Sequence, residues 1–562
     1  MMFRKISHHL SVHPFQRHLF FLGLAILAVS INGYHFGTFD QVFHITFLKK
    51  FINPSLYPND PFLRLRWYHF SYFWFPFIPL LKAGLLEISM FIVHILTVYG
   101  TIWMFWALSN LLFNNEFANL LISLALIFSH IGFPGFQIIE FSLLNRTFVL
   151  PFVLGSIWLY LKEKKILAFL LLGLMFNLHV IYVIFVLCMF LLNEAIRFQW
   201  KLWWKPLLLM GIFVLAGLPV LIWRMQTGSG IDFTLRPEML DLASRGLLYT
   251  VYYPVGDILH VIGNLIAGIG TVWAFILGYR QAPSTAKHRT MRNFAYAIAI
   301  LICVSIVATY LLPVTILLQM QILRAGVFML YFGILYFGYF LCDQVENGRL
   351  SSQGFLLLGL SFVILISPLA AILFWYLNLH LKNTLFKHGL LIPVILAIQA
   401  VTLIISTRSG LRAPGFHIYG PKSPWREVQE WAKENTAIDA MFISPPQMFW
   451  HYLPDWRVFS ERATIATIPE LMEIPFDPEF EDSFRNRFEA VAPGAIEKFN
   501  GNYIQTLEIT EQAFYTNDKA DFVDLSCQFS ADYLVVEKEH PYRFETIFQN
   551  EGFIIYKLPG CK

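Results

Sequence analysis

Two aspartates are the first candidates for chemistry in a sequence with few carboxylates over most of its length. Residues 1–409 contain only 13 Asp and Glu side chains, so each can be considered individually. Asp40 follows an apolar run and is flanked by aromatic residues, where partial burial would raise the pKa of its carboxyl and favour a role as a base. Asp60 stands in the segment Pro-Asn-Asp-Pro. The alternatives are a helix-capping role for Asp40 and a turn for Asp60.

The same two aspartates are the candidate ligands of a metal ion. Carboxylates suit a divalent cation such as Mg²⁺ or Mn²⁺. His44 lies one helical turn after Asp40 and could hydrogen-bond to it or bind the same cation. An Asp/His pair alone is a weak metal signal. The sequence therefore leaves metal dependence open and names Asp40 and Asp60 as the ligands if a metal is used.

Arginines are expected at the same membrane edge as the two aspartates. A guanidinium binds phosphate oxygens through two parallel hydrogen bonds, and cations at membrane depth tend to face a cavity or a headgroup. The alternative for each arginine is snorkelling of its side chain to the interface. The arginines in question are Arg64, Arg66, Arg146, Arg224 and Arg324.

His179 interrupts a long apolar stretch. Residues 166–192 are too many for one span between two basic clusters that must share a side, so we expect two short helices meeting near the exoplasmic face. A histidine at that break is either a buried side chain with its hydrogen bonds satisfied or a ligand of the substrate. Together with His44, Arg64 and Arg66, it completes the set of candidate substrate-binding residues.

The elements that must position these residues are membrane helices. Of the 562 residues, 57% are hydrophobic and 14% are charged, whereas soluble domains carry roughly 25% charged residues. This composition excludes a soluble enzyme, a disordered chain and a small disulfide-rich secreted module. The sequence predicts an α-helical polytopic membrane protein with roughly 11–13 transmembrane helices and a C-terminal soluble α/β domain.

The N-terminal region predicts the orientation of the chain. Basic residues precede an apolar run that starts near Leu19, which indicates a retained first membrane helix with a cytoplasmic N-terminus, the alternative being a signal peptide. Residues 38–84 are then a long first exoplasmic loop that ends in a short interfacial helix over Phe70–Leu81. Basic clusters around Lys162, Arg197 and Arg289 mark cytoplasmic turns.

Charge divides the chain into two domains. Residues 1–409 carry about 27 Lys and Arg against 13 acids, and residues 410–562 carry about 14 against 24. We therefore expect a basic membrane domain and an acidic soluble domain, with membrane lipids as neighbours and no nucleic-acid partner, because neither part has a clustered basic face. In the tail, a helix should begin after Ser423. Cys527 and Cys561 could pair only in an oxidising compartment.

The layout resembles the GT-C superfamily of integral membrane glycosyltransferases. A basic N-terminus, one helix, a long first exoplasmic loop with an acidic residue near its start, many further helices and a soluble C-terminal domain are all shared with that superfamily. The local similarity lies in Gly37-Thr38-Phe39-Asp40-Gln41, Tyr57-Pro58-Asn59-Asp60-Pro61-Phe62, Asn177-Leu178-His179, Gln321 to Arg324, Trp425 to Trp431, Asn435-Thr436 and Met441 to Pro446.

The resemblance implies an activity and roles for the residues. Members move a sugar from a polyprenyl-phosphate donor to a lipid, glycan or protein acceptor. By resemblance, Asp40 would deprotonate the acceptor, Asp60 would orient it or help Asp40 hold a cation, and Arg324 would hold the donor phosphate with Arg146 or Arg224.

The resemblance also has a departure and a consequence for location. Members often carry two adjacent acidic residues where Gln41 follows Asp40, so the alternative is a non-catalytic relative that acts as a lipid or polymer transporter or as an envelope assembly factor. The resemblance places the tail on the exoplasmic side of what we expect to be a bacterial inner (plasma) membrane.

Overall fold

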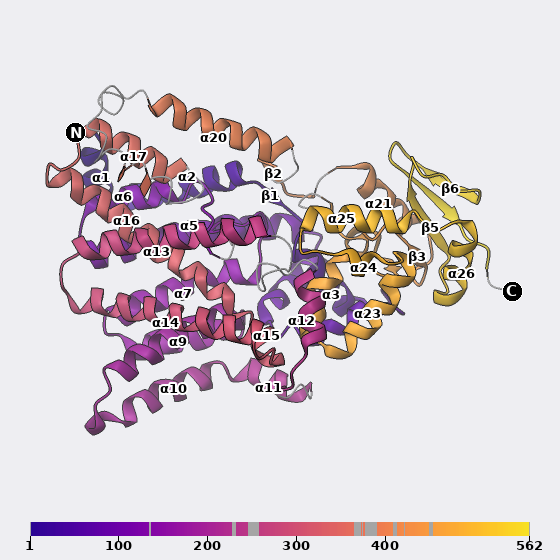
Figure 1. The fold of residues 1–562 in the computed structure, drawn as a ribbon, viewed down its shortest axis with the longest axis horizontal. Coiled ribbons are helices and arrows are strands. Elements are labelled where there is room, and N and C mark those ends of the chain that lie inside the picture. The colour runs from indigo at the N-terminus through magenta and orange to yellow at the C-terminus, as the bar shows by residue number, and fades with distance from the viewer. Residues whose placement is uncertain are drawn as a thin grey trace.

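A helical body precedes a smaller mixed domain in the computed structural model, which describes residues 2–133, 137–227, 232–245, 258–364, 372–373, 375–376, 391–408, 413–420, 422–448 and 453–560. Figure 1 shows the body helices lying along one another, with the tail beyond their ends and the N-terminus at the opposite end. The elements of the body are α1 (Met2–Val12), α2 (Pro14–Asn32), β1 (Tyr34–His35), α3 (Gln41–Ile52), η1 (Pro61–Trp67), η2 (Tyr72–Phe77), α4 (Ile78–Lys82), α5 (Leu86–Phe113), α6 (Glu116–Ala125), α7 (Asn145–Leu161), α8 (Lys165–Phe176), α9 (Val180–Ile196), η3 (Trp200–Leu202), α10 (Trp204–Ala216), α11 (Leu218–Gln226), α12 (Pro237–Arg245), α13 (Ile258–Gln281), α14 (Ala286–Tyr310), α15 (Thr315–Gln319), η5 (Ile322–Ala325), α16 (Gly326–Glu346), α17 (Ser352–Ile364) and α20 (Leu391–Arg408).

The body contains helices that can cross a membrane. Among the described residues, five helices are long and apolar enough, or six if the bent pair formed by α10 and α11 counts as one span. This is fewer than the predicted 11–13, because other apolar stretches form helices of 10–17 residues. At 1.5 Å per residue, such helices are shorter than the roughly 30 Å of a bilayer core.

Helix α16 is the centre of the body. The span Ile322–Glu346 is buried over its whole apolar window. Its close packing against α13 depends on Gly278, since a Cβ atom there would lie 2.0 Å from the carbonyl oxygen of Tyr336. A helix that is apolar on all sides and surrounded by others fixes the positions of the elements around it.

The broken span is confirmed. Residues 166–192 form α8 and α9, which are separated at Asn177–His179. The break lies beside the first loop, because the carbonyl of Asn177 accepts a hydrogen bond from the backbone N–H of Tyr72 (2.9 Å). The two short helices therefore bring His179 to the loop side of the body.

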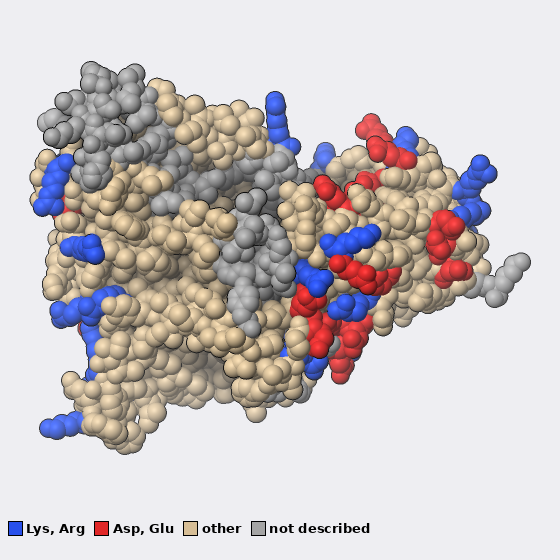
Figure 2. Space-filling view, in the orientation of Figure 1, with Lys and Arg blue, Asp and Glu red and all other residues tan. Residues whose placement is uncertain are grey.

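The basic turns share one side, as predicted. Arg197 donates to the hydroxyl of Thr290 (3.0 Å) and pairs with Glu163 (3.7 Å), which connects the turns after α7, α9 and α13. Figure 2 shows Lys and Arg side chains gathered at the end of the body farthest from the tail, and both charge signs over the tail.

The tail is an α/β domain around a five-stranded sheet. The sheet order is β4-β3-β5-β7-β6; β3 is parallel to β4 and β5, and β7 is antiparallel to β5 and β6. The helix predicted after Ser423 is confirmed as α21, with the Ser423 side chain accepting from the N–H of Arg426. The elements are β2 (Phe416–His417), α21 (Pro424–Asn435), β3 (Met441–Ile443), α22 (Trp456–Ser460), β4 (Ala463–Thr464), η6 (Ile468–Phe476), α23 (Pro478–Val491), α24 (Ala495–Lys498), α25 (Tyr503–Phe514), α26 (Lys519–Phe529), β5 (Tyr533–Glu537), β6 (Glu545–Gln549) and β7 (Phe553–Lys557).

Two sequence predictions about the tail fall partly on residues that are not described. The domain boundary at 409–410 lies between α20, which ends at Arg408, and the tail, which is described from residue 413. The predicted Cys527–Cys561 pairing also lies outside the described residues, because Cys561 is not among them.

The tail docks on the first loop, whose residues are largely helical. Strands β1 and β2 pair in parallel. Gly33 permits this approach, because a Cβ atom there would lie 2.2 Å from the carbonyl oxygen of Ala413. Farther along, the Nζ of Lys49 donates to the Oε1 of Glu461 (2.8 Å). The first loop and the tail therefore lie on the same side of the body.

A buried ion-pair network completes the docking. The Nε of Arg457 lies 2.5 Å from the Oδ2 of Asp60, and its Nη2 lies 2.7 Å from the Oε1 of Glu470. Arg487 pairs with the other oxygen of Glu470 (2.8 Å). The side chains of Arg457, Asp60 and Glu470 are at most 1% exposed. Removal of one partner would leave an uncompensated charge in the interior.

We expect Arg457→Met to destabilise the protein by about 3–5 kcal/mol, because Asp60 and Glu470 would lose their shared cation. The measurement is thermal unfolding of the purified protein in detergent. Arg485→Met is the matched control: Arg485 is 41% exposed and pairs with Glu481 across one helical turn, so its loss should cost under about 1 kcal/mol. Equal melting temperatures for the two variants would contradict the assignment.

Candidate functional site

One cavity collects most of the predicted site residues. It has a volume of about 300 Å³ and lies between the first loop, the break before α9, helices α11 and α15, the segment before η5, and η6 of the tail. Acidic, basic and imidazole side chains line one part of it, and aliphatic and aromatic side chains line another. The predicted residues that line it are Asp40, His44, Arg146, His179, Arg224 and Arg324.

The polar wall centres on Arg146, at the start of α7. Its Nη1 pairs with the Oδ2 of Asp40, while its Nε and Nη2 bind the two oxygens of Glu140 at 2.8 and 2.6 Å. The side chain of Arg146 is 10% exposed and that of Asp40 is 26% exposed to the cavity. Arg146 is therefore held in place by two carboxylates, one on each side of its guanidinium.

This pairing corrects the expected chemistry of Asp40. Asp40 stands at the N-terminus of α3, but in the described structure its side chain makes no capping hydrogen bond. Burial opposes ionisation of the carboxyl, but the charge and hydrogen bond of Arg146 outweigh it and hold the pKa of Asp40 below its ordinary value. The predicted increase in pKa is wrong, because the cation comes from a residue far away in the sequence. A carboxylate with a lowered pKa is a weak base.

Arg224 and Arg324 face the same cavity from α11 and η5. The guanidinium of Arg224 lies over the ring of Phe70, with Cζ 5.7 Å from the ring centroid. Among the described lining residues, Arg146, Arg224 and Arg324 are three guanidinium groups in one small space. Because like charges that share a cavity repel, this arrangement favours an anionic ligand.

Gln321 is a strained residue at the entrance to η5. Its backbone is left-handed, with φ 48° and ψ 48°, which a residue with a side chain adopts at a cost of order 1–3 kcal/mol. It is 3% exposed and lines the cavity, and its Oε1 has no hydrogen-bond partner among the described residues. The strain turns the chain so that Arg324, three residues later, reaches the cavity.

Imidazole groups form another part of the polar wall. The ring of His44 stacks on Trp74, with centroids 4.4 Å apart, and does not hydrogen-bond to Asp40 through its side chain within the described structure. Burial lowers the pKa of His44 well below its usual value. His69, beside it, binds the Oε2 of Glu473 through its Nε2 (2.6 Å). Glu473 belongs to η6, so the tail supplies part of the cavity wall.

His179 caps α9 at the cavity. Its Nδ1 accepts a hydrogen bond from the backbone N–H of Tyr182 (3.2 Å), so one ring nitrogen has a partner. The side chain also lines the cavity. Beyond it the wall is apolar and comes from the first turns of α9 and from α11. The apolar lining residues are Phe176, Leu178, Val180, Ile181, Ile184, Phe185, Val220, Leu221, Ile316 and Met320.

Three predicted site residues lie outside the cavity. Asp60 accepts from the backbone N–H of Phe62 and pairs with Arg457, which is the structural alternative expected of a turn residue. Arg64 pairs with Glu479 of the tail (2.5 Å), and Arg66 lies over the ring of Trp67. The expectation that Asp60, Arg64 and Arg66 face the substrate is therefore corrected: they belong to the docking surface and the loop.

The residues present do not fit a divalent cation between Asp40 and Asp60. Asp40 is bound to Arg146, and Asp60 is bound to Arg457 in a different part of the fold. Within the described ranges, no group of three or more His, Cys, Asp and Glu side chains is arranged to hold a metal. Each candidate carboxylate is thus already neutralised by a guanidinium.

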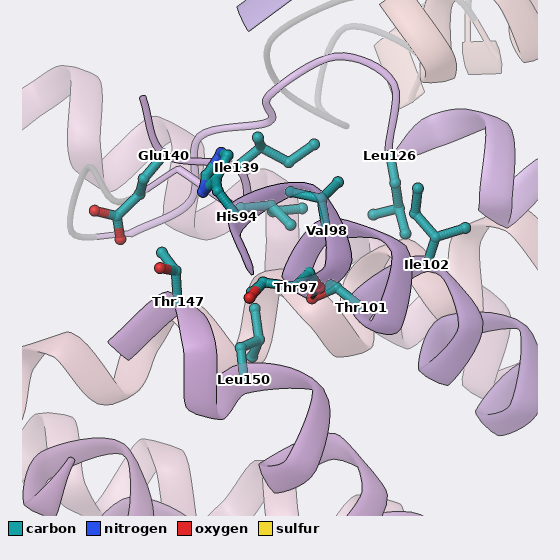
Figure 3. A pocket seen from close by; sticks show the side chains of 11 residues that line it. His94, Thr97, Val98, Thr101, Ile102, Leu126, Ile139, Glu140, Thr147 and Leu150 are labelled. Carbon is teal, nitrogen blue, oxygen red and sulfur yellow. Dashed lines mark hydrogen bonds between the residues drawn. The ribbon is translucent and has the colours of Figure 1, made fainter. Parts of the chain in front are cut away.

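A second, enclosed cavity lies beside Glu140 (Figure 3). It has a volume of about 20 Å³, which is room on the order of one water molecule. Threonines of α5 and α7 line it together with His94, and neither ring nitrogen of His94 has a hydrogen-bond partner among the described residues. In Figure 3 the carboxylate of Glu140 points away from His94. This space is too small for a sugar or a headgroup.

Sequence reasoning missed three residues of this site. Glu140 precedes Arg146 by six residues. Because carboxylates are scarce in the body, its presence there could have marked it as a site residue. His69 lies in the first loop, where a histidine has no pattern to mark it. Glu473 is one of 24 acids in the tail, and no pattern in the sequence distinguishes it from the others.

We expect Arg146→Gln to raise the pKa of Asp40 above its ordinary value, because burial is then opposed only by the weaker effects of Arg324 and His44. The measurement is infrared spectroscopy of the carboxyl band in the purified protein. At about pH 6 the variant should show a protonated carboxyl that disappears in the Arg146→Gln/Asp40→Asn double variant, whereas the wild-type Asp40 stays ionised. In the wild type, the contribution of Asp40 to stability should be lost only below the ordinary carboxyl pKa. Identical spectra for wild type and Arg146→Gln would contradict the pairing.

Comparisons with known proteins give a family match in the tail and a similarity to solved structures. Residues 423–491, which span α21 to the end of α23, match a family described as Domain of unknown function (DUF6798). No curated protein sequence is similar to the chain. A crystal structure of ArnT from Cupriavidus metallidurans bound to undecaprenyl phosphate is similar to this chain with a TM-score of 0.46 and 12% sequence identity, over 96% of this chain and 97% of that chain.

Proposed function

We propose that this protein is a membrane glycosyltransferase that moves a sugar from a polyprenyl-phosphate donor to a lipid, glycan or protein acceptor at the exoplasmic face of a bacterial plasma membrane. The observation that carries the proposal is the cavity, in which guanidinium groups and an aliphatic wall share one space of about 300 Å³. A polyprenyl phosphate has matching parts, an anionic headgroup and a hydrocarbon chain. The sequence resemblance to GT-C enzymes points to the same substrate class.

The arginines supply the phosphate end of the proposed site. Arg324 and Arg224 would bind the phosphate oxygens, and Arg146 would orient the sugar side of the headgroup while Asp40 and Glu140 hold it in place. When the bond between the sugar and the phosphate breaks, negative charge develops on the phosphate oxygen. Guanidinium groups fixed at that position stabilise the charge and lower the barrier.

The short helices supply the apolar end. Helices α10 and α11 are bent by 63° where they meet, which turns α11 toward the cavity. Val220 and Leu221 of α11 line the same space as Val180 and Ile181 of α9. Because neither α9 nor α11 is long enough to span the bilayer alone, their ends leave an aliphatic surface at membrane depth for a hydrocarbon chain.

The charge distribution supports an exoplasmic cavity. The basic turns lie at the end of the body opposite the tail, and the positive-inside rule assigns such turns to the cytoplasm. The cavity is lined by the first loop and by η6 of the tail, which lie at the other end. Polyprenyl-linked sugars presented on the outer leaflet would reach it from that side.

The same placement favours an enzyme over the alternative of a transporter. A transporter needs a path from one face of the membrane to the other. The lining residues among those described come from the first loop, from the adjoining ends of body helices and from η6 of the tail, and none of them comes from the basic turns. Such a cavity suits a reaction at one face of the membrane.

We expect Arg324→Gln to weaken binding of undecaprenyl phosphate about 10–100-fold, because a charge-assisted hydrogen bond contributes about 1.5–3 kcal/mol. The measurement is native mass spectrometry of the purified protein with undecaprenyl phosphate, and with undecaprenol as the ligand without a phosphate. Arg289→Gln is the control, because Arg289 is exposed in a basic turn of α14. Equal affinity of the wild type for both lipids would contradict the proposal.

A further inference from the structure

The cavity contains a second acid–base pair that Asp40 does not take part in. The Nε2 of His69 lies 2.6 Å from the Oε2 of Glu473. An ionised carboxylate only accepts hydrogen bonds, so Nε2 is the donor, and in the neutral ring Nδ1 is then the nitrogen that carries the lone pair. A carboxylate that fixes the tautomer and orientation of an imidazole is the arrangement that prepares a histidine to accept a proton.

The pair is rigid and shielded from bulk water. The side chains of His69 and Glu473 are 15% and 4% exposed, and both residues line the cavity. The ring of His69 packs against the rings of His44 and Phe47, each with centroids 5.1 Å away. These contacts restrict rotation of the imidazole within the cavity wall.

The pair joins the two domains. His69 lies in the first loop, between η1 and η2, and Glu473 lies in η6 of the tail. The pair is therefore complete only when the tail is docked on the loop through Arg457, Asp60 and the other ion pairs. Docking of the tail would then assemble an acid–base group as well as a wall of the cavity.

Asp40 is less suited to take a proton than this pair. Its carboxylate is bound to Arg146, and that cation holds its pKa below the ordinary value. A neutral imidazole whose orientation is fixed by a carboxylate is better prepared to accept a proton than a carboxylate bound to an arginine. Within one cavity, the group that positions the arginine and the group that could move a proton are thus different residues.

We propose that His69 is the general base of the transfer reaction and that Glu473 is its positioning residue, an inference that rests on the proposed function. The acceptor is then a molecule with a free hydroxyl. As its oxygen forms a bond to the anomeric carbon of the donor, its proton moves to Nδ1 of His69. The bond between that carbon and the phosphate oxygen breaks, and its electron pair leaves with the lipid phosphate, which Arg224 and Arg324 bind. Glu473 stabilises the imidazolium that forms.

The test compares variants in the transfer reaction itself. Lipid-linked and envelope glycans are analysed by mass spectrometry in bacterial cells with and without the wild-type chain, which defines the product. The rate of its formation is then measured in isolated membranes from about pH 5 to pH 8, across the range in which an imidazole titrates. Binding of undecaprenyl phosphate is measured for every variant as a check on folding.

We expect His69→Asn to lower the rate about 100-fold or more and to abolish its increase with pH, because the contribution of a general base is lost. Glu473→Gln should lower the rate and change its pH profile, since the imidazolium that forms would lose its neighbouring carboxylate. Asp40→Asn should retain the shape of the pH profile, whatever its effect on the rate. The controls are His540→Asn and Glu497→Gln, two exposed residues of the tail, which should behave as the wild type.

The outcomes separate this inference from the proposed function. A product that requires the wild-type chain and is formed at full rate by His69→Asn would overturn the role of His69 and leave the proposed function in place. Loss of the pH dependence in Asp40→Asn instead of His69→Asn would assign the base to Asp40. If no glycan depends on the wild-type chain, the proposed function fails and the role of His69 fails with it.

Discussion

The attraction between a basic first loop and an acidic tail is the constraint on which the other features of this structure depend. Lys49 and Arg64 of the loop bind carboxylates of the tail. In the pair between Arg457 and Asp60 the signs are exchanged: the tail supplies the cation and the loop supplies the carboxylate. The pair between Arg64 and Glu479 is exposed and contributes little by itself. Arg457 is different, because it is buried with its partners and cannot be exposed to water without separating the two domains.

Docking has a direct consequence for the cavity. Glu473 reaches the cavity wall only because η6 packs beside the first loop, so a soluble domain contributes to a site that is otherwise made by membrane helices and loop residues. The body and the tail therefore form the cavity together. A change in the docking ion pairs alters the cavity at a distance, since His69 loses its carboxylate when the tail moves away.

The helices of the membrane body must also place polar groups beside a hydrocarbon environment. Short helices end where polar side chains are needed, and the chain breaks at Asn177–His179 and at Gln321 expose backbone and side-chain groups on the side of the first loop. Helix α16, buried on all sides, fixes the start of this segment.

Composition and periodicity alone determined the class of this protein. The scarcity of charge predicted membrane helices, the charge difference between residues 1–409 and 410–562 predicted an acidic soluble tail, and the break near His179 was visible as a polar interruption of an apolar run. The helix after Ser423 was predictable from its cap. These are local signals, because each depends on residues that are close together in the sequence.

Only the tertiary structure decided which aspartate lies in the cavity and which lies in the docking network. Asp40 and Asp60 look alike in the sequence, yet one is bound to Arg146 in the cavity and the other to Arg457 in the docking network. Both partners are more than 100 residues away. The pKa of a carboxyl is set by the charges and the burial around it in space, and a sequence read along its length contains neither. For the same reason the pairing of His69 with Glu473, across 404 residues, had no signal in the sequence.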